Sequence, residues 1–410
     1  MKDQAYYTHP IFDDTMLNLE IGRELEQRSA DRTLTHLGKA GKAANELEFP
    51  SAKSEAWRWT DFSNLDSKSY ANLASKPAKL RFSGNTQGAI FMEFDQAMLE
   101  HFNLLNSYLG TIISPDADRF AALASVYANQ GFVLWIPKGA EITEGLEVSI
   151  ETVSAGLHFG HSLVVLEPGS RCKLTIHRQS ASKQSSLTLE NLEILLGSGA
   201  ELDLVEIIDQ SVETSTIARE KAKLMENSRM RWIYGHLGEG HGKHFIDIDL
   251  AGTRSEAKIR GFYFIGSKED IDLDTQVNHL AANTKSDLLF KGAANGNGKV
   301  TWEGMIYVDP VAQGTDGYQA NRNLALSANA EIHSIPGLEI CADDVKCSHG
   351  ATVGRIDAEE LFYLESRGMP KDVAEKLIVN GFFAEVIDEI KEPKLHEQLS
   401  ERINEKLSER

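Results

Sequence analysis

The segment Lys173-Leu174-Thr175-Ile176-His177 has apolar side chains at alternate positions, and Asp247-Ile248-Asp249-Leu250 repeats this pattern farther along the chain. In an extended strand, alternate side chains point to the same face, so each segment predicts a β-strand with one buried face. A run at 132–136, Phe-Val-Leu-Trp-Ile, is wholly apolar and is followed by Pro-Lys-Gly. These segments indicate short strands that end in turns.

Strands of this kind follow one another over more than half of the chain. Gly, Ser, Asn and Asp separate them, as at Gly197-Ser198-Gly199-Ala200. No helical pattern long enough for a βαβ crossover lies between them, which leaves two sandwiches, a propeller or a β-helix. The sequence shows no fixed-period propeller signature, and the irregular but dense spacing of its strands, with small residues at corners, favours the β-helix. The further strands are expected at 146–150, 162–166, 187–195, 201–208, 231–234, 245–250, 258–264, 287–290 and 299–308.

Helical patterns flank the strands on the N-terminal side. Apolar residues spaced among Glu and Arg predict an amphipathic helix over 13–37, and two further helices are expected over 96–108 and 118–129. The aromatic stretch 55–62, which contains Trp57 and Trp59, is interpreted as a core or docking anchor rather than a ligand site.

The C-terminal side is also helical. Asp357 is a predicted N-cap, Gly368 ends the first helix, and Pro370 opens a second that ends at Pro393. The tail, 395–410, alternates acids and bases and is expected to be a solvated helix. The predicted organisation is a mostly helical region at 1–129, a β-helix core at 130–355 and a helical domain at 356–410.

Composition narrows the class of protein. The 410 residues include 61 acids and 42 bases, for a formal charge of −19, which disfavours a nucleic-acid surface because phosphates are repelled. No apolar stretch approaches the ~20 residues of a membrane span. Three cysteines cannot build a disulfide framework, and the polar start predicts no secretory signal. We therefore expect a cytoplasmic protein that does not cross a membrane.

The segment 341–350, Cys-Ala-Asp-Asp-Val-Lys-Cys-Ser-His-Gly, carries the most specific chemistry. Thiolate and imidazole are preferred ligands of zinc, iron and iron–sulfur centres. On a strand, Cys347 and His349 point to the same face, and Cys341 would join them if that strand were unbroken. This set is one or two ligands short of a closed site, so a metal would be shared with another chain or weakly held. The alternative is small buried cysteines beside a hydrogen-bonded histidine.

Two other groups of residues could bind metal. The alternating acids Asp247 and Asp249, with Asp270, Asp272 and Asp274, could bind calcium or cleave a polysaccharide, or could simply line a solvent-facing strand. The Gly-rich stretch 235–244 contains His236, His241 and His244, whose spacing could suit a metal but is more typical of an exposed loop.

The C-terminal third resembles the SufB/SufD family of the Suf iron–sulfur cluster assembly system. The similarity lies in 315–324, in 342–354 around Asp-Asp-Val-Lys-Cys-Ser-His-Gly, and in 361–368, Leu-Phe-Tyr-Leu-Glu-Ser-Arg-Gly. It implies a right-handed parallel β-helix between helical end domains, and a scaffold rather than an enzyme. SufB-like chains have a cysteine where this chain has Ala320, and His-Glu where it has His349-Gly350, which points to the SufD branch.

The resemblance also implies partners. A SufD-like chain pairs with a SufB-like sister, and a SufC-like ABC ATPase binds the C-terminal helices; a homodimer is plausible in isolation. His349 would be a ligand or proton-handling group for a transient iron–sulfur cluster at the interface, with Cys347 beside it, and no cofactor would bind the isolated chain tightly. Cys341 and Cys347 both stay open as ligands. The docking element, 360–390, would contact the ATPase through Leu361, Tyr363, Leu364, Arg367, Val373, Leu377 and Phe382.

Two other classes of protein compete with this scaffold. The acid rows would suit a carbohydrate-active β-helix enzyme, which a lyase assay with calcium would detect. The Cys/His segment would suit a zinc-stabilised structural protein.

Overall fold

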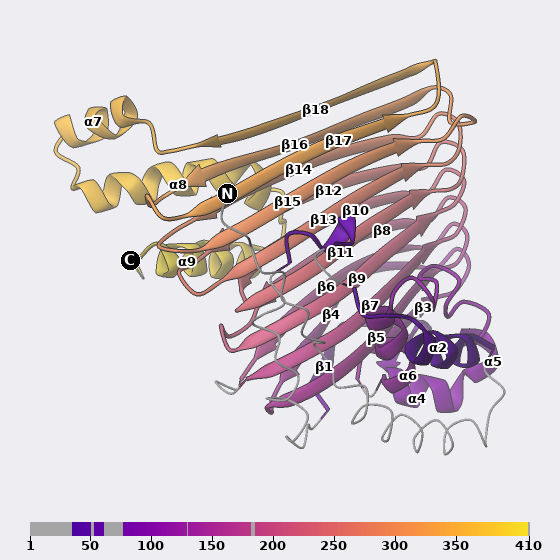
Figure 1. Ribbon diagram of the computed structural model, residues 1–410. Helices are drawn as coiled ribbons and strands as arrows, with labels where there is room; N and C mark the ends of the chain where they lie inside the picture. The colour runs from indigo at the N-terminus through magenta and orange to yellow at the C-terminus, as the bar shows by residue number, and fades with distance from the viewer. Residues whose placement is uncertain (1–34, 51–52, 61–76, 129, 182–184, 409–410) are drawn as a thin grey trace.

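The computed structural model describes residues 35–50, 53–60, 77–128, 130–181 and 185–408. Two nine-stranded sheets face each other and form a parallel β-solenoid of about 8 turns, with 49% of residues in strands and helices at both ends. Figure 1 shows the strands stacked along one direction, with the helices at the margins. The mainly β architecture predicted from the strand pattern, and the β-helix favoured within it, are confirmed.

The two sheets take alternate strands of the chain, because each coil contributes one strand to each sheet. Sheet A contains, in spatial order, β1 (Lys79–Ser83), β4 (Glu141–Thr152), β6 (Arg171–Ser180), β8 (Glu201–Asp209), β10 (Arg229–Gly238), β12 (Glu256–Ile265), β14 (Lys285–Ala294), β16 (Thr315–Ala325) and β18 (Val345–Gly354). Sheet B contains β2 (Ile90–Glu93), β3 (Phe132–Ile136), β5 (Gly156–Leu166), β7 (Ser186–Leu196), β9 (Thr214–Leu224), β11 (His241–Leu250), β13 (Asp270–His279), β15 (Lys299–Val308) and β17 (Glu331–Ile340).

The strand register explains why the sequence shows no fixed period. Residues that face each other on neighbouring strands of sheet A, such as Arg229 and Glu256 or Lys285 and Asp316, are separated by 27 to 31 positions. The coils therefore differ in length at their turns while their strands stay aligned.

The two ends of the solenoid differ. At the first coil, β1 and β2 pair antiparallel with β4 and β3, so the chain folds back over this end. Both strands fall within the region predicted to be mostly helical. At the other end, β17 and β18 are the last strands of their sheets, and no further described strand pairs with them. An edge strand offers unpaired backbone groups to a partner.

The core lies between the sheets. Alternate residues of each strand point inward, and the largest fully buried side chains include Trp232 and Trp302. These indoles belong to a continuous apolar cluster that also contains Leu174, Ile248 and Ile259. The alternation that predicted the strands therefore also places their apolar faces correctly.

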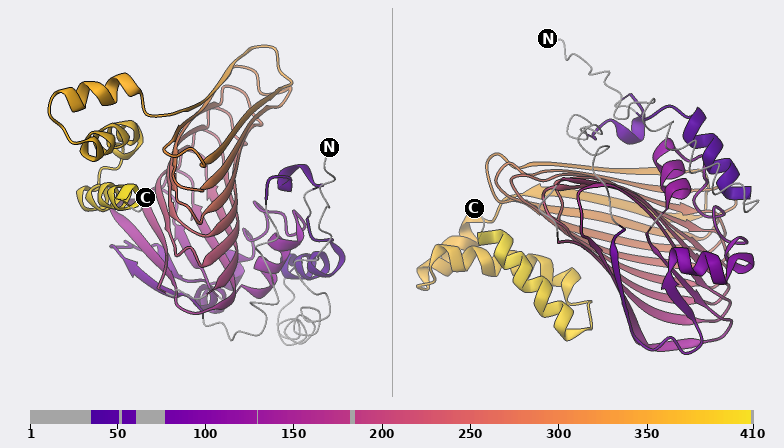
Figure 2. Two further views of the ribbon diagram at one scale, coloured as in Figure 1. Left: turned by 60° about the vertical axis from the view of Figure 1, so that its left-hand side comes forward. Right: turned by 90° about the horizontal axis from the view of Figure 1, so that it is seen from below.

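The N-terminal helices cover the outer face of sheet B (Figure 2). They are α2 (Thr35–Glu46), a short 3-10 turn (Glu55–Trp57), α4 (Phe94–Glu100), α5 (Phe102–Leu105) and α6 (Arg119–Tyr127). The Trp57 ring lies 5.2 Å from Phe120 and 5.3 Å from Phe245, and Trp59 stacks on His333 at 5.3 Å. The aromatic stretch is therefore a core and docking anchor, as predicted.

The predicted N-terminal helices are confirmed in part. The helix expected at 118–129 is α6, whose N-cap Asp118 accepts from the backbone N–H of Ala121. The helix expected at 96–108 is instead two short helices, because α4 ends at Glu100 and α5 begins at Phe102. Most of the predicted helix 13–37 lies outside the described residues; α2 overlaps only its end.

The C-terminal helices lie on the side of the solenoid formed by sheet A, opposite the N-terminal helices (Figure 2). They are α7 (Ala358–Ser366), α8 (Lys371–Ile387) and α9 (Pro393–Ser408). Helices α8 and α9 join a buried apolar cluster with sheet A, whereas α7 has no buried residue. Asp357 caps α7, accepting from the backbone N–H of Glu359 at 2.7 Å, as predicted.

Two details of the C-terminal prediction are wrong. The second helix ends at Ile387, and Pro393 begins α9 instead of ending α8. The tail is also not merely solvated, because Leu399, Ile403 and Leu407 are buried against the solenoid. Lys406, only 3% exposed, donates to the carbonyl of Leu237 at 2.7 Å and to Glu269 at 2.7 Å. The sequence of this helix is rich in charged residues, but its few apolar residues recur at helical spacing and form a narrow apolar stripe.

Candidate functional site: the terminal coil and the C-terminal helices

Cys347 and His349 lie on β18, the last strand of sheet A. Cys347 is half-buried and His349 is exposed. In the strand register Cys347 faces Gly317 and His349 faces Gln319, whose amide donates to the carbonyl of Gly337 inside the solenoid. Both side chains are therefore on the inner face of an exposed edge strand, where a partner could complete a ligand set.

A second histidine, His279, lies near the same glycine as Cys347. A Cβ placed on Gly317 would lie 3.3 Å from the Cys347 Sγ and 3.5 Å from both His279 Nε2 and Ser286 Oγ. Burial lowers the pKa of His279 to about 4, and its Nε2 lies 2.9 Å from Ser286 Oγ. The sequence analysis did not identify His279. His279 and Cys347 are far apart in the chain, and only the stacking of the coils brings both of them close to Gly317.

Burial also raises the pKa of Cys347, although the backbone of Gly317 partly opposes this. A thiol must lose its proton to bind a metal, so ligation at Cys347 would release a proton.

Cys341 is separated from the other two residues. It is exposed and follows the end of β17 at Ile340, whereas β18 begins only at Val345. The unbroken strand that would have aligned it with Cys347 does not exist, so strand geometry does not bring Cys341 to the same face.

Four of the seven predicted ATPase contacts, Tyr363, Arg367, Val373 and Leu377, are exposed on or beside α7 and α8, and Leu361, Leu364 and Phe382 are half-buried. Tyr363 is 57% exposed, Leu377 is 52% exposed and Val373 is 46% exposed. Arg367 lies over the Tyr363 ring at 5.2 Å. A groove of about 450 Å³ runs between the two helices, lined by Glu359, Glu360, Tyr363, Leu364, Leu377 and Ile378.

Phe382 is half-buried through contacts with the solenoid. It packs towards the solenoid, where Lys291 lies 4.8 Å from its ring and donates to its carbonyl oxygen at 2.8 Å. Its placement suits a residue that holds α8 in position.

The acid rows do not form an open catalytic or calcium site. Lys243, which is 1% exposed, lies 3.0 Å from Asp272, and Asp249 lies 2.9 Å from Lys221. Thr60 of the N-terminal segment donates to Asp272 at 2.7 Å. Burial raises the pKa of Asp274 to about 7. These pairings do not favour a carbohydrate-active enzyme, and they also show that the row is not simply solvent-facing.

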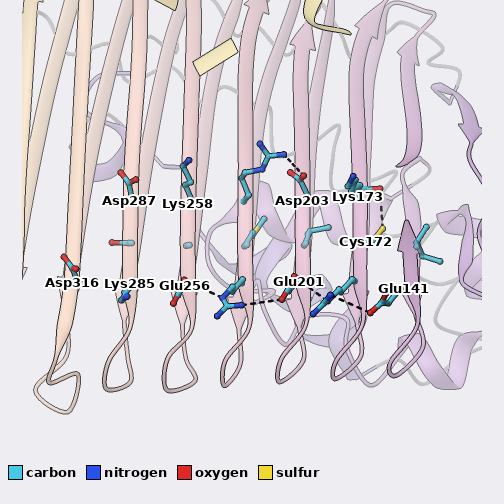
Figure 3. Close-up of a pocket in the computed structure, with 18 of the residues that line it drawn as sticks. Glu141, Cys172, Lys173, Glu201, Asp203, Glu256, Lys258, Lys285, Asp287 and Asp316 are labelled. Atoms are coloured by element: carbon cyan, nitrogen blue, oxygen red, sulfur yellow. Dashed lines mark hydrogen bonds and ion pairs between the residues drawn. The ribbon is translucent and has the colours of Figure 1, made fainter. Parts of the chain in front are cut away.

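A groove of about 990 Å³ lies along sheet A and is lined by charged side chains (Figure 3). One row of directly opposed residues alternates in sign from strand to strand and continues onto β18. Arg171 lies 3.5 Å from Glu201, and Arg229 lies 3.5 Å from Glu201 and 3.6 Å from Glu256. Because each charged residue lies opposite a residue of the other sign in this register, the row favours the observed alignment of the strands. The full row is Glu141, Arg171, Glu201, Arg229, Glu256, Lys285, Asp316 and Lys346.

Buried charge is concentrated between the sheets. Arg178 of β6 donates to Glu190 of β7 at 2.6 Å and to Glu206 of β8 at 2.9 Å, and Glu220 of β9 lies 3.7 Å away. All four side chains are nearly inaccessible. Burial raises the pKa of Glu190 and Glu220, even though Arg178 opposes the shift.

The histidines at 235–244 are not in an exposed loop, so that interpretation is wrong. His236 lies on β10 and His244 on β11, and both are completely buried beside Glu239. His241 is half-buried at the start of β11.

These features define a parallel β-solenoid whose last coil presents a cysteine and a histidine on an open edge, with two accessible helices beside it. Comparison with known proteins gives the family. Residues 149–382 match the family model "SUF system FeS cluster assembly, SufBD core domain", and residues 74–148 match the "SufBD protein N-terminal region". The chain therefore belongs to the SufBD family.

Curated relatives bear both family names. An iron–sulfur cluster assembly SufBD family protein of Mycobacterium bovis is 28% identical over 299 residues, covering 71% of this chain and 74% of the relative. The iron–sulfur cluster assembly protein SufD of Escherichia coli is 32% identical over 269 residues, covering 65% of this chain and 62% of the relative. SufB of Bacillus subtilis is 25% identical over 302 residues, covering 72% and 64%. Among the described residues, no helix is long and apolar enough to cross a membrane.

Proposed function

We propose that this chain is a non-enzymatic scaffold subunit of the Suf iron–sulfur cluster assembly system, of the SufD type. Its family membership supports the scaffold role. The SufD type is supported by Ala320, which stands on β16 where SufB-like chains have a cysteine, and by Gly350 after His349. The scaffold would act in the cytoplasm, paired with a SufB-like sister.

The nascent cluster would form at the open edge of the solenoid, with His349 as this chain's ligand or proton-handling group. The observation that carries this proposal is the placement of His349 and Cys347 on one face of β18, the edge strand of sheet A. Only part of a ligand set is present there, so the sister subunit would supply the rest. In isolation, the same edge could pair two copies of this chain.

Replacing His349 by alanine is expected to reduce cluster assembly by the complete complex at least tenfold. The side chain is exposed, so its removal costs the fold little. The measurement is iron and sulfide content, with the cluster's visible absorbance, after reconstitution with the sister subunit and the ATPase. Ser348→Ala is the matched control, because Ser348 is also exposed but points to the opposite face of β18. Undiminished assembly by the folded His349→Ala complex would refute the assignment.

The ATPase would bind the groove between α7 and α8. The exposed aromatic and aliphatic side chains there support this proposal, because a large contiguous apolar patch on a protein surface usually marks an interaction site. The packing of α8 and α9 against sheet A would transmit the motion of the ATPase to the solenoid.

The double variant Tyr363→Ala/Leu377→Ala is expected to weaken ATPase binding at least tenfold, because central interface anchors commonly cost about 2 kcal/mol or more each when truncated. Binding is measured by calorimetry with the full chain, with and without ATP. A cut before Glu360 should abolish binding, but it would also uncover the apolar face of sheet A. Glu401→Ala, an exposed position on α9, is the control. Native affinity in the folded double variant would place the docking surface elsewhere.

A further inference from the structure

A compact ligand set lies inside the solenoid, away from the terminal coil. It consists of His236 on β10, His244 on β11 and Glu239 in the connection between them, all 0% exposed. One ligand atom from each residue lies within 4.8 Å of the other two. Because β10 belongs to sheet A and β11 to sheet B, the set spans the two sheets.

The distances suit coordination by one ion. His236 Nε2 lies 3.2 Å from Glu239 Oε2, and His244 Nε2 lies 2.8 Å from the same oxygen. Two ligands bound to one tetrahedral zinc at about 2.0–2.1 Å are themselves roughly 3.3 Å apart. The two imidazole rings meet edge to face, with centroids 5.5 Å apart, and both Nε2 atoms lie near the same carboxylate oxygen.

Space beside these atoms depends on a glycine. Gly242 lies two residues before His244 on the same inward face, and a Cβ there would lie 2.3 Å from Glu239 Oε2 and 2.8 Å from His244 Nε2. These separations approach metal–ligand bond lengths. Any side chain at position 242 would therefore occupy the point where an ion would contact both ligands.

The surroundings favour a cation. Glu239 Oε1, both carboxylate oxygens of Glu220 and the Tyr234 hydroxyl are buried and have no hydrogen-bond partner among the described residues. Three carboxylates, Glu190, Glu206 and Glu220, surround the single guanidinium of Arg178. Lys406 donates to the carbonyl of Leu237 near the same turn, but its ammonium group is already paired with the carboxylate of Glu269.

We propose that His236, Glu239 and His244 form a binding site for a divalent metal ion of the zinc class, enclosed within the solenoid. Two imidazole nitrogens and one carboxylate are the donors that zinc and its first-row neighbours prefer over magnesium or calcium. The three protein ligands leave one tetrahedral position for water. The ion joins the two sheets at one coil, and it enters while the coil closes because the finished site is inaccessible. This site is independent of the proposed role of the terminal coil.

The test is zinc content of the full chain, expressed with zinc, then dialysed against a chelator to strip surface metal. We expect one zinc per chain by elemental analysis, and X-ray absorption should show a first shell of nitrogen and oxygen without sulfur. Glu239→Gln should lower zinc affinity at least about tenfold, since metal sites are commonly this sensitive even to loss of a supporting partner. His241→Asn, in the same stretch, and Cys347→Ala/His349→Ala should retain the metal.

Two results would overturn the proposal. One is a native chain without stoichiometric zinc after growth in excess metal. The other is zinc that persists in folded Glu239→Gln but is lost in Cys347→Ala/His349→Ala, or whose first shell contains sulfur. Circular dichroism checks the fold of each variant. If Glu239→Gln fails to fold, the zinc content and absorption spectrum of the native chain still decide the matter.

Discussion

Replacing Arg178 by alanine should lower the free energy of unfolding by about 3–5 kcal/mol, because removing one partner leaves buried charges uncompensated. Arg178 is 3% exposed and donates to Glu190 and Glu206, which lie on strands of opposite sheets. No other described cation is placed to replace it within this cluster. Chemical denaturation, followed by circular dichroism, measures the loss.

The loss should depend on pH. Burial raises the pKa of Glu190 and Glu220 in the folded chain, so acid protonates them and removes the unpaired negative charges. Groups of this kind contribute stability that is lost as pH rises. The Arg178→Ala penalty should therefore be smaller near about pH 5 than near about pH 8.

Arg171→Ala is the matched control for the same residue type on the same strand. Its side chain is 55% exposed and its ion pairs are 3.5 and 3.7 Å long, so its removal should cost about 0–1 kcal/mol. Equal losses from the two variants would mean that the buried network does not bind the sheets together.

Replacing Phe383 by alanine should release α8 and α9 from the solenoid. Phe383 is 0% exposed, and its ring lies 6.5 Å from Phe262 of sheet A. Truncating a buried phenylalanine costs about 3–5 kcal/mol. Because the cluster that holds these helices is separate from the core between the sheets, the loss should be local.

Hydrogen exchange measures this effect helix by helix. Protection of α8 and α9 should fall by roughly two to three orders of magnitude, as a loss of this size implies, while the solenoid strands keep theirs. Phe362→Ala, at a 70% exposed position on α7, should leave both unchanged. Uniform loss of protection across the chain after Phe383→Ala would show that helices and solenoid unfold as one unit.

Much of the fold could be predicted from local patterns. The alternation at 173–177 and 247–250 lies within β6 and β11, and Asp357 caps α7 as expected. These features depend on neighbours within a few residues, which the sequence displays directly. The placement of Cys347 and His349 on one strand follows from the same short-range reasoning.

Features that depend on neighbouring coils could not be predicted. The glycines around His236 suggested a loop, yet Gly235 lies within β10. Glycine is needed at this position because a Cβ there would lie 2.4 Å from the Phe262 ring of the next coil. Likewise, the acid Asp272 gains its partner Lys243 from the preceding coil. Such contacts join residues almost thirty positions apart, and one sequence does not reveal which pairs will meet.

The alternating charge row on sheet A has a consequence for how the solenoid could change in length. Deleting the single coil that contributes Arg229 would set Glu201 against Glu256, whereas deleting two adjacent coils would restore opposite charges at the junction. Like charges directly opposed across strands are destabilising. Evolutionary insertions and deletions of whole coils should therefore be tolerated more readily in pairs, giving the repeat count a preferred parity.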